Sequence, residues 1–136
     1  MKAVFADTSY YLALVSPHDK DHVAACEWTS GFSGTTVTTA WVIAELANAM
    51  SQTGNRPFFL SLWRDLQSDA RVTVVPPTGE MFARGLDLYA RRPDKDWSLT
   101  DCISFLVMQD HALTDAATLD HHFIQAGFNI VIPGLY

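Results

Sequence analysis

The stretch of sequence that decides the fold is Lys2-Ala3-Val4-Phe5-Ala6-Asp7-Thr8-Ser9. Residues 2–6 form a short, mostly apolar run, which is typical of a buried β-strand, and Asp7 ends that run. A helical pattern follows from Tyr10 to Val15. In open α/β sheets ligands bind beyond the carboxyl ends of the strands, so a carboxylate that directly follows a buried strand is well placed for function. We therefore expect a polar site beside Asp7.

Strands alternate with helices along the rest of the chain. Several strands are wholly apolar, which predicts an α/β fold: a three-layer α/β/α arrangement with a central, mostly parallel sheet covered on both faces. The predicted strands are Lys2–Ala6, Thr35–Thr39, Arg71–Val75, Ala116–Leu119 and Asn129–Ile132. The predicted helices are Tyr10–Val15, Asp21–Ser30, Trp41–Met50, Phe58–Gln67, Gly79–Arg91, Ser98–Gln109 and His121–Ala126. The length of 136 residues suits one compact domain, so residues 1–136 are predicted to form a single domain.

Four acidic residues stand far apart in the sequence, each beside an apolar run: Asp7, Glu45, Asp101 and Asp120. Asp7 and Asp120 directly follow predicted strands, so both belong at the same edge of a parallel sheet. Two carboxylates about 4 Å apart repel by roughly 4 kcal/mol at an effective dielectric constant near 20. A divalent cation relieves such repulsion, and ligation by oxygen alone favours Mg²⁺ or Mn²⁺ over zinc.

Each carboxylate also has a purely structural interpretation. Asp7 and Asp120 stand where a helix N-cap is expected, and Asp101 has capping-box spacing from Ser98. Glu45 is the exception, because its neighbours are apolar and no helix end requires a carboxylate there. We expect Glu45 to be buried, and burial of its charge demands a metal or a cationic partner.

Hydroxyl groups stand beside three of these acids. Thr8 and Ser9 follow Asp7, Ser104 lies one turn after Asp101, and Thr118 lies two residues before Asp120. We expect such hydroxyls to orient the carboxylates.

The net charge of −6 weighs against a nucleic-acid ligand, but only mildly, because acids that bind a metal do not repel phosphate as their formal charge suggests. Basic side chains gather just before Asp101, at Arg84, Arg91, Arg92 and Lys95. Two interpretations stay open for them: an ordinary solvated helix end, or contact with an RNA backbone.

The ordered set of motifs around the four acids resembles the PIN-domain family, and specifically the ribonuclease toxins of VapBC-type toxin–antitoxin pairs. The likeness spans nearly the whole chain. The motifs that resemble the family are residues 4–9 with Ala13, residues 38–45 with Asn48, residues 97–105, and residues 113–128.

The resemblance implies that Asp7, Glu45 and Asp101 are metal ligands and that Asp120 is a more variable fourth acid. Asp115 is an alternative for the fourth position, and Asp96 is a further acid beside the third motif. The implied activity is hydrolysis of RNA phosphodiester bonds with Mg²⁺ or Mn²⁺. A divalent cation lowers the pKa of a bound water and offsets charge on the phosphate, so no lysine or histidine is needed as a base.

The resemblance further implies an antitoxin partner and a homodimer. Aromatic residues in excess of one core's needs suit either contact, and they are Tyr10, Tyr11, Trp28, Phe32, Phe58, Phe59 and Trp63. No membrane span or signal-peptide pattern is visible, and Cys26 and Cys102 stand singly, so a reduced cytoplasmic protein is expected.

Three other functional classes remain as rivals. Within the PIN fold, the alternatives are an RNA-processing nuclease outside any toxin–antitoxin pair and a catalytically inactive RNA- or protein-binding module. A signalling receiver domain also gathers acids at a sheet edge, but the chain has no lysine after Lys95 to match that fold. A zinc site at His121 and His122 is disfavoured, because adjacent helical side chains are expected to point apart.

Overall fold

A computed structural model describes residues 2–133 and shows one five-stranded sheet with the strand order β3-β2-β1-β4-β5. Every neighbouring pair of strands is parallel, which confirms the predicted sheet. Met1 and residues 134–136 of the predicted single domain lie outside the described residues. The strands are β1 Ala3–Ala6, β2 Thr35–Thr39, β3 Val72–Val75, β4 Asp115–Ala117 and β5 Asn129–Ile130.

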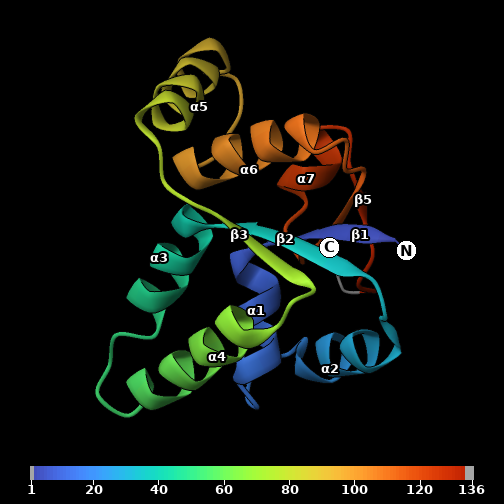
Figure 1. Cartoon of the computed structure of the whole chain (residues 1–136). Coiled ribbons are helices and arrows are strands. Elements are labelled where there is room, and N and C mark those ends of the chain that lie inside the picture. Colours follow the sequence, from blue (N-terminus) through green and yellow to red (C-terminus); the bar gives the residue numbers. More distant parts are fainter. Residues whose placement is uncertain (1, 134–136) are drawn as a thin grey trace.

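The helices form a layer on each face of this sheet (Figure 1), as the predicted three-layer α/β/α class requires. α1, α2, α3 and α4 lie on one side, and α6 and α7 lie on the other, with α5 packed outside α6. The helices are α1 Thr8–Val15, α2 His22–Gly31, α3 Ala40–Ala49, α4 Arg56–Ser68, α5 Gly79–Arg91, α6 Leu99–Asp110 and α7 His122–Gln125. None of these helices is long and apolar enough to cross a membrane. The cytoplasmic location stays a prediction.

The central strand β1 is buried on both faces. Val4, Phe5 and Ala6 are each at most 1% exposed. The Phe5 ring lies 6.2 Å from that of Phe123 in α7, and the Phe123 ring lies 5.0 Å from that of Phe105 in α6. Aromatic pairs at such distances add stabilisation beyond their buried area, so this chain of rings fixes α6 and α7 against the sheet.

The order of the strands reverses at β1. From β1 the chain moves through β2 to β3 on one side, and β4 and β5 then lie on the other side. In parallel sheets the crevice at such a switch point is where ligands bind. Asp7 directly follows β1 and Thr118 directly follows β4, so both stand at this crevice.

Helix α5 differs from its sequence pattern. Phe82, Leu86 and Tyr89 are 45%, 43% and 54% exposed, whereas Met81 packs against the core. The apolar residues of this helix do not share one buried face: a narrow strip that includes Gly85 faces α6, whereas Phe82, Leu86 and Tyr89 are exposed. Sequence periodicity cannot detect this split, because it depends on the width of the surface that α6 offers.

Candidate active site

The four acids predicted from the sequence line one hollow of about 320 Å³ at the switch point between β1 and β4. They reach it from different parts of the fold: Asp7 follows β1, Glu45 lies in α3, Asp101 lies in the first turn of α6, and Asp120 lies between β4 and α7. The remaining lining residues are Thr8, Ser9, Leu12, Asp96, Ser98 and His122. The convergence inferred from the sequence is thus present in the structure.

Asp7 is the most deeply buried of these acids, at 4% exposure. The pKa of its carboxyl group is raised to about 7, mainly by burial, with smaller contributions from the charges of Asp101 and Asp120. The hydroxyl of Thr118 opposes this effect by donating a hydrogen bond of 2.8 Å to Oδ2 of Asp7, which also accepts one of 3.1 Å from Ser9. Asp7 occupies the N-cap position of α1, but its side chain makes no capping hydrogen bond. The capping interpretation of Asp7 is therefore wrong.

Asp101 has two roles in the geometry. Its Oδ2 accepts a hydrogen bond of 3.1 Å from the backbone N–H of Ser98, and the Ser98 hydroxyl accepts one of 3.0 Å from the N–H of Asp101, so the predicted capping box is present. Asp101 is nevertheless 7% exposed and borders the hollow, where burial and the charge of Asp120 raise its pKa. The capping box fixes the orientation of a carboxylate that faces the site.

Asp120 and His122 form a compact turn at the entrance to α7. The backbone N–H of His122 donates a hydrogen bond of 2.9 Å to Oδ1 of Asp120. The same turn brings Nδ1 of His122 to 3.2 Å from Oδ1 of Asp120 and 3.1 Å from Oδ2 of Asp101. The capping interpretation of Asp120 is half right, because its side chain binds a backbone N–H near the start of α7, although His121 occupies the N-cap position.

His122 is a residue of the hollow that the sequence argument missed. The expectation that the two histidines point apart is wrong, since their ring centroids lie 4.6 Å from each other. Candidate ligand atoms of Asp120, His121 and His122 all lie within 4.8 Å of one another. Helical spacing misled the prediction, because His121 precedes α7 as its N-cap residue and only His122 begins the helix. One sequence feature could have predicted that His122 belongs to the site. It lies two residues after Asp120, an acid that follows a predicted strand.

Glu45 requires a correction. Its side chain lines the hollow, but the residue is exposed rather than buried. Val42 and Leu46 form the buried face of α3, whereas Ala44 and Glu45 face outward. The argument that an isolated buried charge forces Glu45 to bind a metal is therefore wrong, and only its position at the rim of the hollow supports a role.

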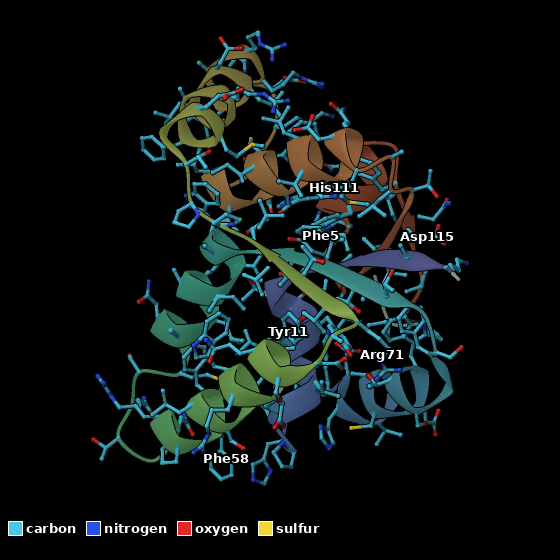
Figure 2. The ribbon with its side chains drawn as sticks, in the orientation of Figure 1. Phe5, Tyr11, Phe58, Arg71, His111 and Asp115 are labelled. Carbon is cyan, nitrogen blue, oxygen red and sulfur yellow. The ribbon has the colours of Figure 1, made fainter. Side chains whose placement is uncertain are left out.

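Asp115 does not belong to the hollow. It begins β4, at the opposite end of the strand from Asp120, and its Oδ2 lies 2.8 Å from Nζ of Lys2. Figure 2 shows it beside the start of β1. Hydrogen bonds from Lys2 and Asn129 hold the pKa of Asp115 below its usual range. Asp115 therefore lies apart from the acids that line the hollow, which are Asp7, Glu45, Asp96, Asp101 and Asp120, and the identity of the fourth acid stays a prediction.

Three of the four predicted hydroxyls take part in the site. Ser9 and Thr118 lie 3.0 Å from each other while both donate to Asp7. Thr8 also lines the hollow, and its buried hydroxyl has no hydrogen-bond partner among residues 2–133. Ser104 is the exception, because it donates to the backbone carbonyl of Thr100.

The residues present fit a divalent cation. A buried carboxyl group with its pKa near 7, two further acids that raise it, and a hydroxyl without a protein partner form an oxygen-rich donor set. Carboxylate, hydroxyl and water oxygens are the ligands that Mg²⁺ and Mn²⁺ prefer.

The PIN domain family profile matches residues 4–129 of the chain, a span that contains every residue of the hollow. The chain belongs to the PIN domain family. The family resemblance inferred from the ordered motifs is confirmed.

Individual PIN proteins are similar to this chain over almost its full length. The 23S rRNA-specific endonuclease VapC20 of Mycobacterium tuberculosis is 26% identical over 131 residues, which cover 96% of this chain and 98% of VapC20. The crystal structure of VapC20, described as a sarcin–ricin loop cleaving toxin, has a TM-score of 0.87 at 22% identity, covering 96% of this chain and 99% of that one.

Two structures of toxin–antitoxin pairs share the fold at lower similarity. VapBC2 of Rickettsia felis, bound to a DNA fragment from its promoter, has a TM-score of 0.66 at 12% identity and covers 94% of this chain and 96% of that one. A toxin–antitoxin complex of Klebsiella pneumoniae has a TM-score of 0.65 at 14% identity, with coverages of 98% and 99%.

Proposed function

We propose that this PIN domain is an endoribonuclease that hydrolyses RNA phosphodiester bonds at the acidic hollow, with Mg²⁺ or Mn²⁺ as cofactor. The observation that supports this most directly is the meeting of Asp7, Asp101 and Asp120 at the switch point of the sheet, with the pKa of Asp7 raised to about 7. A buried carboxyl group of this kind holds its proton in the absence of a partner, and a divalent cation would displace that proton to solvent and bind the carboxylate in its place.

The proposed roles follow from the contacts. Asp7, Asp101 and Asp120 are the ligands for the cation, and Glu45 is a further ligand that approaches from the open rim. Ser9 and Thr118 hold Oδ2 of Asp7 in place by hydrogen bonds, and the capping box holds Asp101. When bound, the divalent cation activates a water for attack on phosphorus and neutralises charge on the phosphate.

Purified protein incubated with RNA tests this assignment. We expect cleavage that requires Mg²⁺ or Mn²⁺, stops on addition of EDTA, and falls at least 100-fold in Asp7→Asn, because that change removes a ligand charge at the most buried position. The matched control is Asp115→Asn, which removes an equivalent charge at the far end of β4 and is expected to cleave normally. Full activity in Asp7→Asn would exclude the proposed site.

We also propose that the chain is the toxin of a toxin–antitoxin pair. The similarity to VapC20 over nearly the whole length supports this, and ribosomal RNA is the substrate to test first, because VapC20 is named as specific for 23S rRNA. Induced expression in a bacterial host should arrest growth, and co-expression of the gene directly upstream should relieve the arrest. Cleavage of RNA without growth arrest or a neutralising neighbour would instead indicate an RNA-processing nuclease. Binding of RNA without cleavage would indicate an inactive module.

A groove between α2 and α4 is the proposed site for the antitoxin. It has a volume of about 260 Å³, and its apolar walls come from helices α1, α2 and α4. The aromatic and leucine residues that line it are Tyr10, Tyr11, Leu14, Trp28, Phe32, Leu62 and Leu66. The Tyr11 hydroxyl is buried there without a hydrogen-bond partner among residues 2–133. A groove lined mainly by apolar residues, with Asp65, Asp69 and Arg71 as charged members of its lining, suits an amphipathic segment of a partner protein.

Substitutions on one helix test this groove. Leu66 in α4 lines it, whereas Leu60 in the same helix lies outside it and is 53% exposed. We expect Leu66→Glu to weaken antitoxin binding at least 10-fold by calorimetry, with Leu60→Glu as the control that binds normally. Equal loss in both variants would place the antitoxin elsewhere.

The homodimer stays a proposal as well, to be tested by light scattering of the purified chain.

A further inference from the structure

A second hollow continues from the acidic site along the connection between α5 and α6. This α5–α6 groove has a volume of about 560 Å³, and it shares Asp96 and Ser98 with the acidic hollow. Its other lining residues are Tyr89, Ala90, Arg92, Pro93, Lys95, Trp97 and Cys102. The shared residues Asp96 and Ser98 place this groove next to the acidic hollow.

The cations near the groove differ in how they are held. Arg84 pairs with Asp110 at 2.7 Å and Arg91 pairs with Asp87 at 2.8 Å, which supports the solvated-helix interpretation for these two. Lys95 lines the groove and makes no ion pair with any residue in 2–133. Of the groove's two cations, Arg92 and Lys95, Lys95 is the one without an ion pair among residues 2–133, although its charge contributes to lowering the pKa of Asp94.

Arg92 forms a fixed wall of the groove. Its guanidinium donates two hydrogen bonds of 3.0 Å to Asp94 and lies 5.0 Å above the centroid of the Trp97 ring. Trp97 is itself buried, and its indole N–H donates a hydrogen bond of 3.0 Å to Gln125. Trp97 therefore supports the wall and does not offer a face for stacking.

Tyr89 is the aromatic ring that the groove exposes. It lies in the last turns of α5, lines the groove, and is 54% exposed. An exposed ring beside an unpaired lysine is the combination that binds single-stranded nucleic acid, where bases stack on aromatic faces and cations contact the backbone. Paired bases in an RNA duplex do not offer their faces in this way.

We propose that the α5–α6 groove binds single-stranded RNA next to the phosphate that is cut, with a base stacked on Tyr89 and a backbone phosphate against Lys95. This inference rests on the proposed ribonuclease activity and adds to it a determinant of substrate class. It accounts for how a chain of net charge −6 holds a polyanion, since the available cation lies immediately beside the acids.

The test measures binding of a fluorescently labelled single-stranded RNA to the Asp7→Asn protein, so that cleavage does not interfere. We expect Tyr89→Ala to weaken binding about 5-fold or more, since stacking of a base on an aromatic ring contributes roughly 1–3 kcal/mol. Tyr89→Phe is expected to bind normally because it keeps the ring. Lys95→Gln is expected to lower the slope of log K against log salt by about 0.7, the contribution of one phosphate contact on a single strand.

Matched controls separate this groove from general surface effects. Phe82→Ala removes another exposed ring from α5, and Lys20→Gln removes an exposed lysine from the loop after α1; neither residue lines the groove. Both controls are expected to bind RNA normally. Equal losses in Tyr89→Ala and Phe82→Ala would overturn the proposal, as would a change of molecular mass by light scattering in Tyr89→Ala, which would assign the ring to a subunit contact.

The failure of this inference is distinguishable from the failure of the proposed function. If the wild-type chain cleaves RNA while Tyr89→Ala and Lys95→Gln bind normally, only the groove assignment is wrong. If the wild-type chain neither binds nor cleaves RNA, both proposals fail. A labelled RNA duplex that binds as tightly as the single strand, with the same losses in the variants, would overturn the assignment to single-stranded RNA.

Discussion

Thr118 illustrates how a single neutral side chain sets the chemistry of a charged one. Its hydroxyl, which is fully buried, donates to Oδ2 of Asp7 at 2.8 Å and accepts from the backbone N–H of Asp120 at 3.1 Å. The donated hydrogen bond lowers the pKa of Asp7 against the larger effect of burial. Thr118 thus connects two acids that are more than a hundred residues apart in sequence.

Replacing Thr118 by valine should raise the pKa of Asp7 and lower activity. A hydrogen bond to a charged group contributes roughly 1.5–3 kcal/mol, so we expect cleavage at pH 7 to fall about 10-fold or more and to recover partly at higher pH. The measurement is the pH profile of kcat/KM. Thr118→Ser, which keeps the donor, should retain most activity; a loss as large as that of Thr118→Val would show that shape rather than the hydrogen bond matters.

Single substitutions can also decide whether Asp120 or Asp115 is the fourth acid of the site. Asp115 pairs with Lys2 at 2.8 Å and does not line the hollow, whereas Asp120 does. We expect Asp120→Asn to reduce cleavage at least 10-fold with little change in thermal stability. Asp115→Asn should leave cleavage intact and lower the free energy of unfolding by up to about 1 kcal/mol, since one member of its ion pair is exposed. The reverse pattern, measured by cleavage assay and thermal melt, would restore Asp115 as the fourth acid.

At the scale of the elements, local signals predicted the fold well. The observed bounds of β2 and α5 match those predicted, and hydroxyl caps explain the helix starts: Thr39 accepts from the N–H of Val42, and Thr78 accepts from that of Met81. The capping box at Ser98 likewise marks the start of α6. Such signals lie within a few residues of each other, so the sequence alone contains them.

The parts of the site that could not be predicted depend on long-range contacts. The strand predicted over Ala116–Leu119 ends at Ala117, because the N–H of Leu119 donates to the hydroxyl of Ser9 at 3.0 Å instead of continuing the ladder. The strand also begins one residue earlier than predicted, at Asp115, whose carboxylate pairs with Lys2. The exposure of Glu45 has a similar origin, since neighbouring helices cover only one face of α3. The apolar residues next to Glu45 in the sequence therefore led to the incorrect prediction that its side chain is buried.

The contact between α5 and α6 yields a prediction about packing. A Cβ atom added at Gly85 would clash with Cγ1 of Ile103, whose side chain is fully buried. We expect Gly85→Ala to lower the free energy of unfolding by roughly 1–3 kcal/mol, because overpacking outweighs the better helix propensity of alanine. Gly79→Ala is the control at the start of the same helix, where nothing lies within 4 Å of the added atom. Urea unfolding that shows Gly85→Ala to be as stable as Gly79→Ala would contradict the close packing.

For the whole molecule, burial of Asp7 should make the metal-free protein less stable as the pH rises from acidic to neutral. The pKa of Asp7 rises from 3.8 to about 7 on folding, so the folded chain holds more protons than the unfolded chain between these values. Without metal, the free energy of unfolding should therefore fall as pH rises from about 4 to 7, by roughly 4 kcal/mol from this one group. Chemical denaturation in EDTA at several pH values measures this, and the difference between the wild type and Asp7→Asn isolates the contribution of Asp7. A difference that does not change with pH would contradict the burial of the charge.

Metal binding should offset the loss of stability that ionisation of the buried Asp7 causes. A cation that binds only the folded chain stabilises it in proportion to the logarithm of its concentration above Kd. At pH 7.5 we expect Mn²⁺ or Mg²⁺ to raise the midpoint of thermal unfolding of the wild type by several degrees, since ionised Asp7 then gains a partner for its charge. Asp7→Asn begins from a more stable metal-free state and loses a ligand, so its midpoint should hardly respond. If metal shifts both proteins equally, the cation binds elsewhere, and the shared hollow of Asp7, Asp101 and Asp120 is not its site.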